Sequence, residues 1–115
     1  MDIRKTDPEY AEIMERFMRD EAVNGDEVRL PARLHYLAVL AALMGCGGTE
    51  AYRELLPEAL ERGLSPVAVK EVIYQATDYL GYGRVLPFVR VTNEVLTAGG
   101  VSLPLAGQAT VTQEN

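Results

Sequence analysis

The stretch LPARLHYLAVLAALM, residues 30–44, decides the fold that we expect for this chain. Pro31 lies where a helix would begin and Gly45 follows its end, which is the usual order of helix start and stop signals. Apolar side chains occur nearly all round this helix, so we expect it to be buried on several sides at once. Only its first turn, with Arg33 and His35, is strongly polar. The stretch therefore predicts the central helix of a helical domain.

The length, net charge and cysteine count of the sequence limit the classes of protein that we consider. The chain has 115 residues, which is enough for one domain with a modest core. Its net charge of -6 argues against general nucleic-acid binding, which needs a basic face. The apolar run is shorter than the ~20 residues of a membrane-spanning helix, and the charged N-terminus does not resemble a signal peptide. With Cys46 as its one cysteine, the chain forms no intrachain disulfide, and we expect a reducing, cytoplasmic setting.

One further helix is predicted before the central helix and one after it. Asp7 and Pro8 begin an amphipathic helix that ends before a turn at 24–26, and the residues before it form a frayed start. After the glycine-rich turn 45–48, Thr49 caps a helix that runs to Arg62. Pro57 is expected to kink this helix or to divide it into two pieces, because proline lacks a backbone N–H.

The C-terminal half predicts two more helices. Ser65 and Pro66 supply a cap and a first-turn proline, and the helix that they begin ends at the break 81–83. Lys70 lies on the polar side of that helix and is expected to face outward. The last helix is expected over residues 84–98. Since no segment shows the alternation of a strand, the sequence predicts an all-α fold with about five helices.

The expected domain organisation has three parts. Residues 1–29 form an N-terminal helix, residues 30–100 form the helical domain, and residues 101–115 form a tail or linker. The tail has no hydrophobic period, which is typical of a linker or of an extension bound to a partner. Two alternatives stay open: the tail packs on another subunit, or the natural chain continues beyond it.

Two segments, LHYLAVLAALMG at 34–45 and EALERGLSPVAVKEVIYQATDYLGYGRVLPFVRVTNEVL at 58–96, resemble the carboxymuconolactone decarboxylase family. This family also contains the alkylhydroperoxidase D-like proteins. The similarity rests on the A-L-x-x-G-L-[ST] turn at 59–65, the V-x-E-V helix around Glu71, and the Y-x-G-[FY] motif at 79–82. The resemblance implies an all-helical domain that forms homo-oligomers, commonly trimers or hexamers. It also suggests either the first half of a tandem protein or a lone domain descended from one.

The resemblance does not extend to the peroxidase motif. Members of the peroxidase type have C-x-x-C-x-x-x-H after the glycine turn, and this chain has Gly48, Ala51 and Leu55 at those positions. The glutamate of the central helix is replaced by Tyr36. Decarboxylase-type relatives also tend to keep the histidine that Leu55 replaces. A two-cysteine peroxidase reaction is therefore not expected, because Cys46 has no second cysteine to resolve a sulfenic acid.

Several polar side chains are candidates for a site near the glycine turn. The candidate catalytic residues are His35, Tyr36, Cys46 and Glu50, and the candidate substrate-binding residues are Arg33, Tyr82 and Arg84. In a decarboxylase an arginine would bind the carboxylates, Tyr36 would donate to the enolate, and His35 or Glu50 would return a proton. No cofactor is expected, and the spacing of His, Cys and acidic residues predicts no metal site.

Each candidate also has a structural explanation. Tyr36 suits a core position, Cys46 is small enough to fill a core, and Glu50 suits the positive end of a helix dipole. Three functions therefore stay open. The first is a decarboxylase-like carboxy-lyase that acts on a small carboxylated, lactone-type substrate. The second is a catalytically silent domain for oligomerisation, and the third is a one-cysteine antioxidant protein.

Overall fold

The chain divides into two compact units, Met1–Pro31 and Ala32–Asn115, of which the computed structural model describes residues 2–17 and 30–108. Six α-helices and no strand occur among these described residues, and five of the six helices are long. The predicted all-α class with about five helices is thus confirmed.

In the described part of the first unit, residues 2–17 and 30–31, the helices are α1 (Ile3–Thr6) and α2 (Pro8–Arg16). The sequence predicted a frayed start, but the Asp2 side chain accepts a hydrogen bond from the Arg4 backbone N–H at 2.9 Å and caps a single helical turn. Pro8 begins α2 as expected, although the Asp7 side chain does not cap it. The turn predicted at 24–26 lies outside the described residues.

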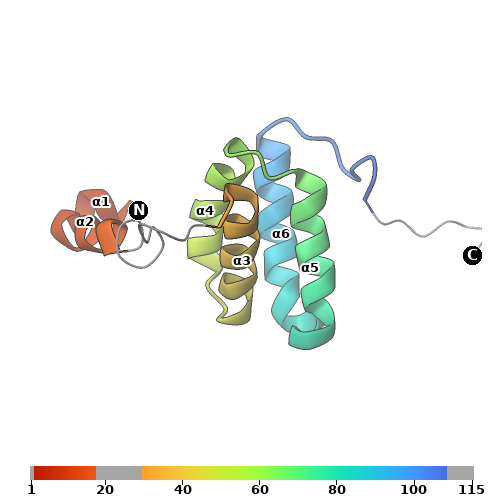
Figure 1. Cartoon of the computed structure of the whole chain (residues 1–115), viewed down its shortest axis with the longest axis horizontal. Helices are drawn as coiled ribbons and strands as arrows, with labels where there is room; N and C mark the ends of the chain where they lie inside the picture. The colour runs from red at the N-terminus through yellow and green to blue at the C-terminus, as the bar shows by residue number, and fades with distance from the viewer. Residues whose placement is uncertain (1, 18–29, 109–115) are drawn as a thin grey trace, which may run out of the picture. The chain divides into compact units, whose positions relative to one another are not determined.

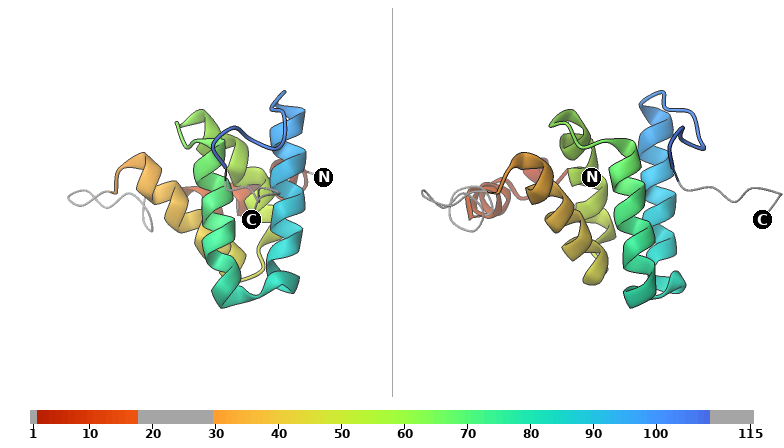
Figure 2. Two further views of the ribbon diagram at one scale, coloured as in Figure 1. Left: turned by 90° about the vertical axis from the view of Figure 1, so that its right-hand side faces the viewer. Right: turned by 45° about the vertical axis from the view of Figure 1, so that its right-hand side comes forward.

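The second unit is a four-helix bundle of α3 (Ala32–Gly45), α4 (Thr49–Glu61), α5 (Pro66–Leu80) and α6 (Tyr82–Ala98) (Figure 1). Two antiparallel hairpins, α3–α4 and α5–α6, lie side by side (Figure 2). Helix α3 packs against α5, and α4 packs against α6. The α3–α4 and α5–α6 turns therefore lie at the same end of the bundle.

The ends of α5 follow the signals read from the sequence. The Ser65 hydroxyl accepts a hydrogen bond from the Ala68 N–H at 3.1 Å, which confirms the predicted cap. The break predicted at 81–83 is shorter than expected: Gly81 alone separates α5 from α6, which already begins at Tyr82. Gly81 has a φ of 88°, and a glycine accepts this conformation without steric cost, so one residue is enough to redirect the chain.

Pro57 does not divide α4, so that alternative was wrong. The helix is continuous over Thr49–Glu61 with Pro57 inside it. Pro57 is exposed. Because proline has no backbone N–H, the Arg53 carbonyl loses its helical hydrogen bond. Arg53 is only half-buried, and its neighbour Glu54 is exposed. Water can therefore bind where the missing N–H would have donated.

The core of the bundle is centred on Tyr52 of α4, whose side chain is completely buried. Its hydroxyl forms a 2.6 Å hydrogen bond with the Thr92 hydroxyl, and its ring meets the edge of Phe88 with centroids 5.1 Å apart. Burial raises the pKa of Tyr52 to about 12, so the phenol stays neutral. The other large side chains without exposed surface come from all four helices: Leu40, Met44, Leu56, Ile73, Val69, Val85 and Leu96.

Helix α3 is buried on one side only, which corrects the expectation of burial on several sides. Tyr36 and Leu40 face the core, whereas Leu34, Ala38 and Ala41 are exposed. The physical reason is the architecture: in a bundle of four helices each helix has core neighbours on its inner side, and its outer side faces away. The apolar residues on that outer side are therefore not covered by the other helices of the bundle.

The beginning of the predicted tail packs on the bundle. Gly107 lies beside Val67, where an added β-carbon would contact it at 3.9 Å. The Gln108 side-chain amide donates to the Tyr74 hydroxyl at 3.2 Å, and the Leu105 N–H donates to the Gln108 side-chain oxygen at 2.7 Å. Residues 101–108 thus lie against α5, and the rest of the predicted tail or linker is outside the described residues.

Replacing Tyr52 by Phe should lower the free energy of unfolding by about 1–3 kcal/mol, because the Thr92 hydroxyl loses its partner inside the core. Urea denaturation measures this change. Adding Thr92→Val should recover part of the loss, since neither polar group then remains. Tyr79→Phe is the matched control because Tyr79 is 91% exposed. A Tyr52→Phe variant as stable as the parent would contradict the assigned hydrogen bond.

Candidate functional site

A hollow of about 340 Å³ lies at the end of the bundle where the α3–α4 turn meets the start of α6. We call it the turn hollow. Its polar lining residues are Cys46, Thr49 and Arg84, and Met44 and Phe88 form part of its apolar wall. Two residues predicted from the sequence, Cys46 and Arg84, are therefore brought together although 38 positions separate them in the chain.

The glycine-rich turn shapes one wall of this hollow. Gly47 has a φ of 73°, and the Gly48 N–H donates to the Leu43 carbonyl at 2.8 Å, so the chain closes α3 and enters α4 at once. A β-carbon on Gly48 would approach Leu43 to 3.1 Å, which leaves little room for a side chain. Cys46 is exposed on this turn, and its thiol donates to the Leu43 carbonyl with a sulfur–oxygen distance of 3.6 Å.

The starts of helices α4 and α6 border the hollow. Helix α4 is capped by Gly48 and α6 by Gly81, and neither cap offers a side-chain acceptor to the first-turn N–H groups. These N–H groups carry partial positive charge. Arg84 adds a full positive charge, and among the described residues the ion pairs are Arg4–Glu15 and Arg53–Glu94, so no carboxylate neutralises it.

The other predicted residues do not line the turn hollow. Glu50 and Tyr82 are exposed neighbours in the first turns of α4 and α6. Tyr36 lies ten residues before Cys46, about 15 Å away along the axis of α3. His35 lies beside Tyr36, and the centroids of the two rings are 4.9 Å apart. Arg33, in the first turn of α3, is farther still from the hollow.

Tyr36 instead faces α4. Its pKa is raised, first by burial and then by the nearby Glu58 carboxylate, while Arg62 acts in the opposite direction. The phenol is therefore neutral and suited to donate a hydrogen bond. Glu58 and Arg62 were not among the predicted site residues. Their spacing of four residues placed them on one face of α4, but nothing in the sequence indicated which helix that face meets.

Lys70 is buried, which corrects the expectation that it faces outward: only 5% of its surface is exposed. Its ammonium donates to the side-chain oxygen of Asn93 in α6, and burial lowers its pKa. Residues 101–108 contact Val67 and Tyr74, which share a face of α5 with Lys70. No carboxylate among the described ion pairs neutralises the charge of Lys70.

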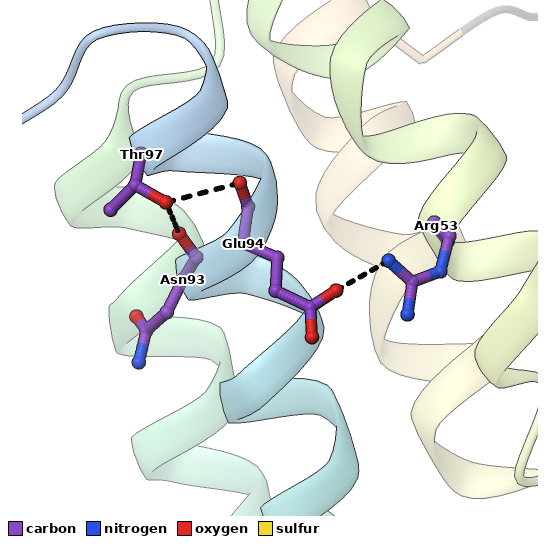
Figure 3. Close-up of polar contacts among 4 residues, drawn as sticks. All are labelled: Arg53, Asn93, Glu94 and Thr97. Carbon is purple, nitrogen blue, oxygen red and sulfur yellow. Dashed lines mark hydrogen bonds and ion pairs between the residues drawn. The ribbon is translucent and has the colours of Figure 1, made fainter.

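Polar contacts on the surface of α6 are structural (Figure 3). The Arg53 guanidinium of α4 forms a 2.6 Å ion pair with the Glu94 carboxylate of α6. The Thr97 hydroxyl donates to the Asn93 carbonyl at 2.8 Å, one helical turn earlier. Because Arg53 and Glu94 are largely exposed, their pair contributes little to stability, although it links two helices that already pack together.

The free energy of unfolding should rise as the pH increases toward 10.5, the ordinary pKa of lysine, because the folded state binds Lys70's proton more weakly than the unfolded state does. Lys70→Met should remove this rise. Urea denaturation between about pH 8 and about pH 10 measures it, since the two states differ in bound protons there. Lys5→Met is the control, because Lys5 is exposed. Equal pH slopes for the parent and Lys70→Met would contradict the prediction.

Comparisons with known proteins found no relative of this chain. No protein-family model, no curated protein and no solved structure matches the chain. Within residues 2–17 and 30–108, no group of three or more His, Cys, Asp or Glu side chains is placed to hold a metal ion. None of the helices in those ranges is long and apolar enough to cross a membrane. The resemblance to the carboxymuconolactone decarboxylase family therefore rests on the sequence motifs.

Proposed function

We propose that the bundle binds a small carboxylated molecule in the turn hollow and acts on it as a carboxymuconolactone decarboxylase-like domain. The observation that carries this proposal is Arg84: the residue lines the hollow and forms none of the ion pairs found among the described residues. The volume of about 340 Å³ is in the lower part of the usual range for small-molecule sites.

The hollow offers three kinds of group to a carboxylated ligand. The Arg84 guanidinium can donate two parallel hydrogen bonds to a carboxylate. First-turn N–H groups of α4 and α6 favour negative charge at the same place. Met44 and Phe88 supply apolar wall for the carbon skeleton. This combination binds an anion by charge and a small organic group by burial.

Decarboxylation in this hollow needs few further groups. When the bond to the carboxylate carbon breaks, carbon dioxide leaves and the electron pair of that bond forms an enolate on the lactone. The Thr49 hydroxyl and the helix-start N–H groups are the donors that stabilise this negative charge. The Cys46 thiol is the acid within the hollow that returns a proton to carbon. His35 and Tyr36 are too distant in the same chain to touch this ligand.

Isothermal titration with an unsaturated γ-lactone carboxylate tests the binding step. The parent should bind, Arg84→Ala should bind at least about tenfold more weakly through loss of a charged hydrogen-bond pair, and Arg90→Ala should resemble the parent. Arg90 is the matched control because it is exposed on the same helix but does not line the hollow. The ligand should also slow the modification of the Cys46 thiol by a thiol reagent.

Two results would contradict this function. Equal affinity of the parent and Arg84→Ala for the ligand would show that the Arg84 guanidinium does not bind the carboxylate. Absence of binding in a folded parent would remove the ligand site altogether, whereas binding without release of carbon dioxide would leave a binding domain without the lyase step.

A domain for oligomerisation is the second candidate function. The specific observation in its favour is the exposed apolar side of α3, where Leu34 keeps 47% of its surface accessible and Ala38 and Ala41 are exposed beside it. Apolar surface of this kind on a helix suits contact with another protein chain.

A further inference from the structure

A second hollow, of about 370 Å³, lies where α4 and α6 end, at the opposite end of the bundle from the turn hollow. We call it the helix-end hollow. Glu61, the last residue of α4, is the one charged side chain among the described residues that line it. Its volume is in the lower part of the usual range for small-molecule sites. The apolar side chains of its walls are Leu60, Leu64, Val95, Leu96 and Val101.

Two matching chain reversals form the walls of the helix-end hollow. After α4 the Leu64 N–H donates back to the Ala59 carbonyl at 3.0 Å, and after α6 the Val101 N–H donates back to the Leu96 carbonyl at 3.0 Å. Each reversal passes through one glycine with a positive φ, which is the Schellman pattern of helix ends. The motif turns the residue after that glycine back over the last helical turn. Leu64 and Val101 are therefore held at the hollow by backbone hydrogen bonds.

Gly99 also lines this hollow, although neither its conformation nor its packing requires a glycine. Its φ of -85° and ψ of 7° are accessible to other residues. An added β-carbon would have only ordinary contacts, at 3.5 and 3.6 Å from two backbone oxygens of α6. A longer side chain at this position would take up space in the hollow. The lack of a side chain at Gly99 thus keeps this part of the hollow open.

The charges around the helix-end hollow favour a cation. Helices α4 and α6 both end here, so the negative ends of two helix dipoles lie beside it. Neither helix has a basic residue in its last turn. Arg62, which follows α4, acts on Tyr36 of α3 and does not line the hollow. Glu61 forms none of the ion pairs found among the described residues, so its carboxylate is available to a ligand.

We propose that the helix-end hollow binds a small alkylammonium ion, whose ammonium group donates to the Glu61 carboxylate and whose hydrocarbon chain lies against the apolar walls. Other kinds of cation fit less well. A metal ion needs several oxygen ligands, and this hollow offers one carboxylate. A quaternary ammonium is typically held by aromatic rings, and the described lining residues include none. The site is separate from the turn hollow in place and in charge, so neither proposal depends on the other.

Titration of the isotope-labelled protein with hexylammonium, followed by NMR, tests the site. The methyl signals of Leu60, Leu64, Val95 and Val101 should move together along one saturating curve. Hexanoate has nearly the same chain and the opposite charge, and it should not move them. Methylammonium has the charge without the chain, and it should bind at least about tenfold more weakly because it buries little apolar surface.

Two variants separate the contributions of charge and space. Glu61→Gln should weaken hexylammonium binding about two- to fivefold, the effect of losing an exposed ion pair. Glu54→Gln is its control, because Glu54 is exposed on the same face of α4 and does not line the hollow. Gly99→Leu should weaken binding about tenfold by filling the space of the hydrocarbon chain. Ala98→Leu is the control of similar bulk, since Ala98 is exposed and does not line the hollow.

Four results would overturn the proposal: no binding of hexylammonium by the folded parent, equal affinity for hexylammonium and hexanoate, unchanged affinity in Glu61→Gln, or unchanged affinity in Gly99→Leu. Signal changes centred on acidic residues elsewhere would also overturn it, because they would show general attraction of a cation to an acidic protein. Circular dichroism checks that each variant is folded. The lactone carboxylate is absent from these titrations, so they succeed or fail independently of the carboxylate site.

Discussion

The buried contact of Tyr52 with Thr92 and Phe88 is the constraint on which the end of the bundle with the turn hollow depends. A hydroxyl without access to water must find a partner, and Tyr52 finds it on α6, so α4 and α6 are fixed in one register. Tyr52 is three residues after the start of α4, and Phe88 is four residues after Arg84. The contact therefore holds the first turns of both helices beside the turn hollow.

The turn hollow shows how an acidic protein can still gather positive groups locally. The chain has a net charge of -6, yet this end of the bundle combines two helix starts with an arginine that lacks a carboxylate partner in the described part of the chain. Partial charges of backbone groups do not contribute to a sequence total, and they act only where the fold gathers them. Net charge thus excludes a broad basic surface but not a small pocket.

Helix α3 shows why a strongly apolar helix need not be the innermost one. Its sequence is apolar on both sides, but in a bundle of four helices only one side meets the core, through Tyr36, Leu40 and Met44. The outer side keeps Leu34 partly accessible. An apolar pattern on two sides of a helix therefore does not by itself mean that the helix is enclosed on both sides within its own bundle.

The sequence by itself determined the all-α class, the start of α2 at Pro8, the positions of α3 to α6 to within a few residues, and the cap of α5 by Ser65, because start and stop signals act on the neighbouring turn of the same helix. Only the tertiary structure decided which residues meet. It joined Cys46 with Arg84, kept Tyr36 at the other end of α3, and buried Lys70 against Asn93. The reason is that the burial and contacts of a side chain depend on which helix packs against it. The hydrophobic periodicity of a helix shows which side is apolar but does not identify the helix that packs there.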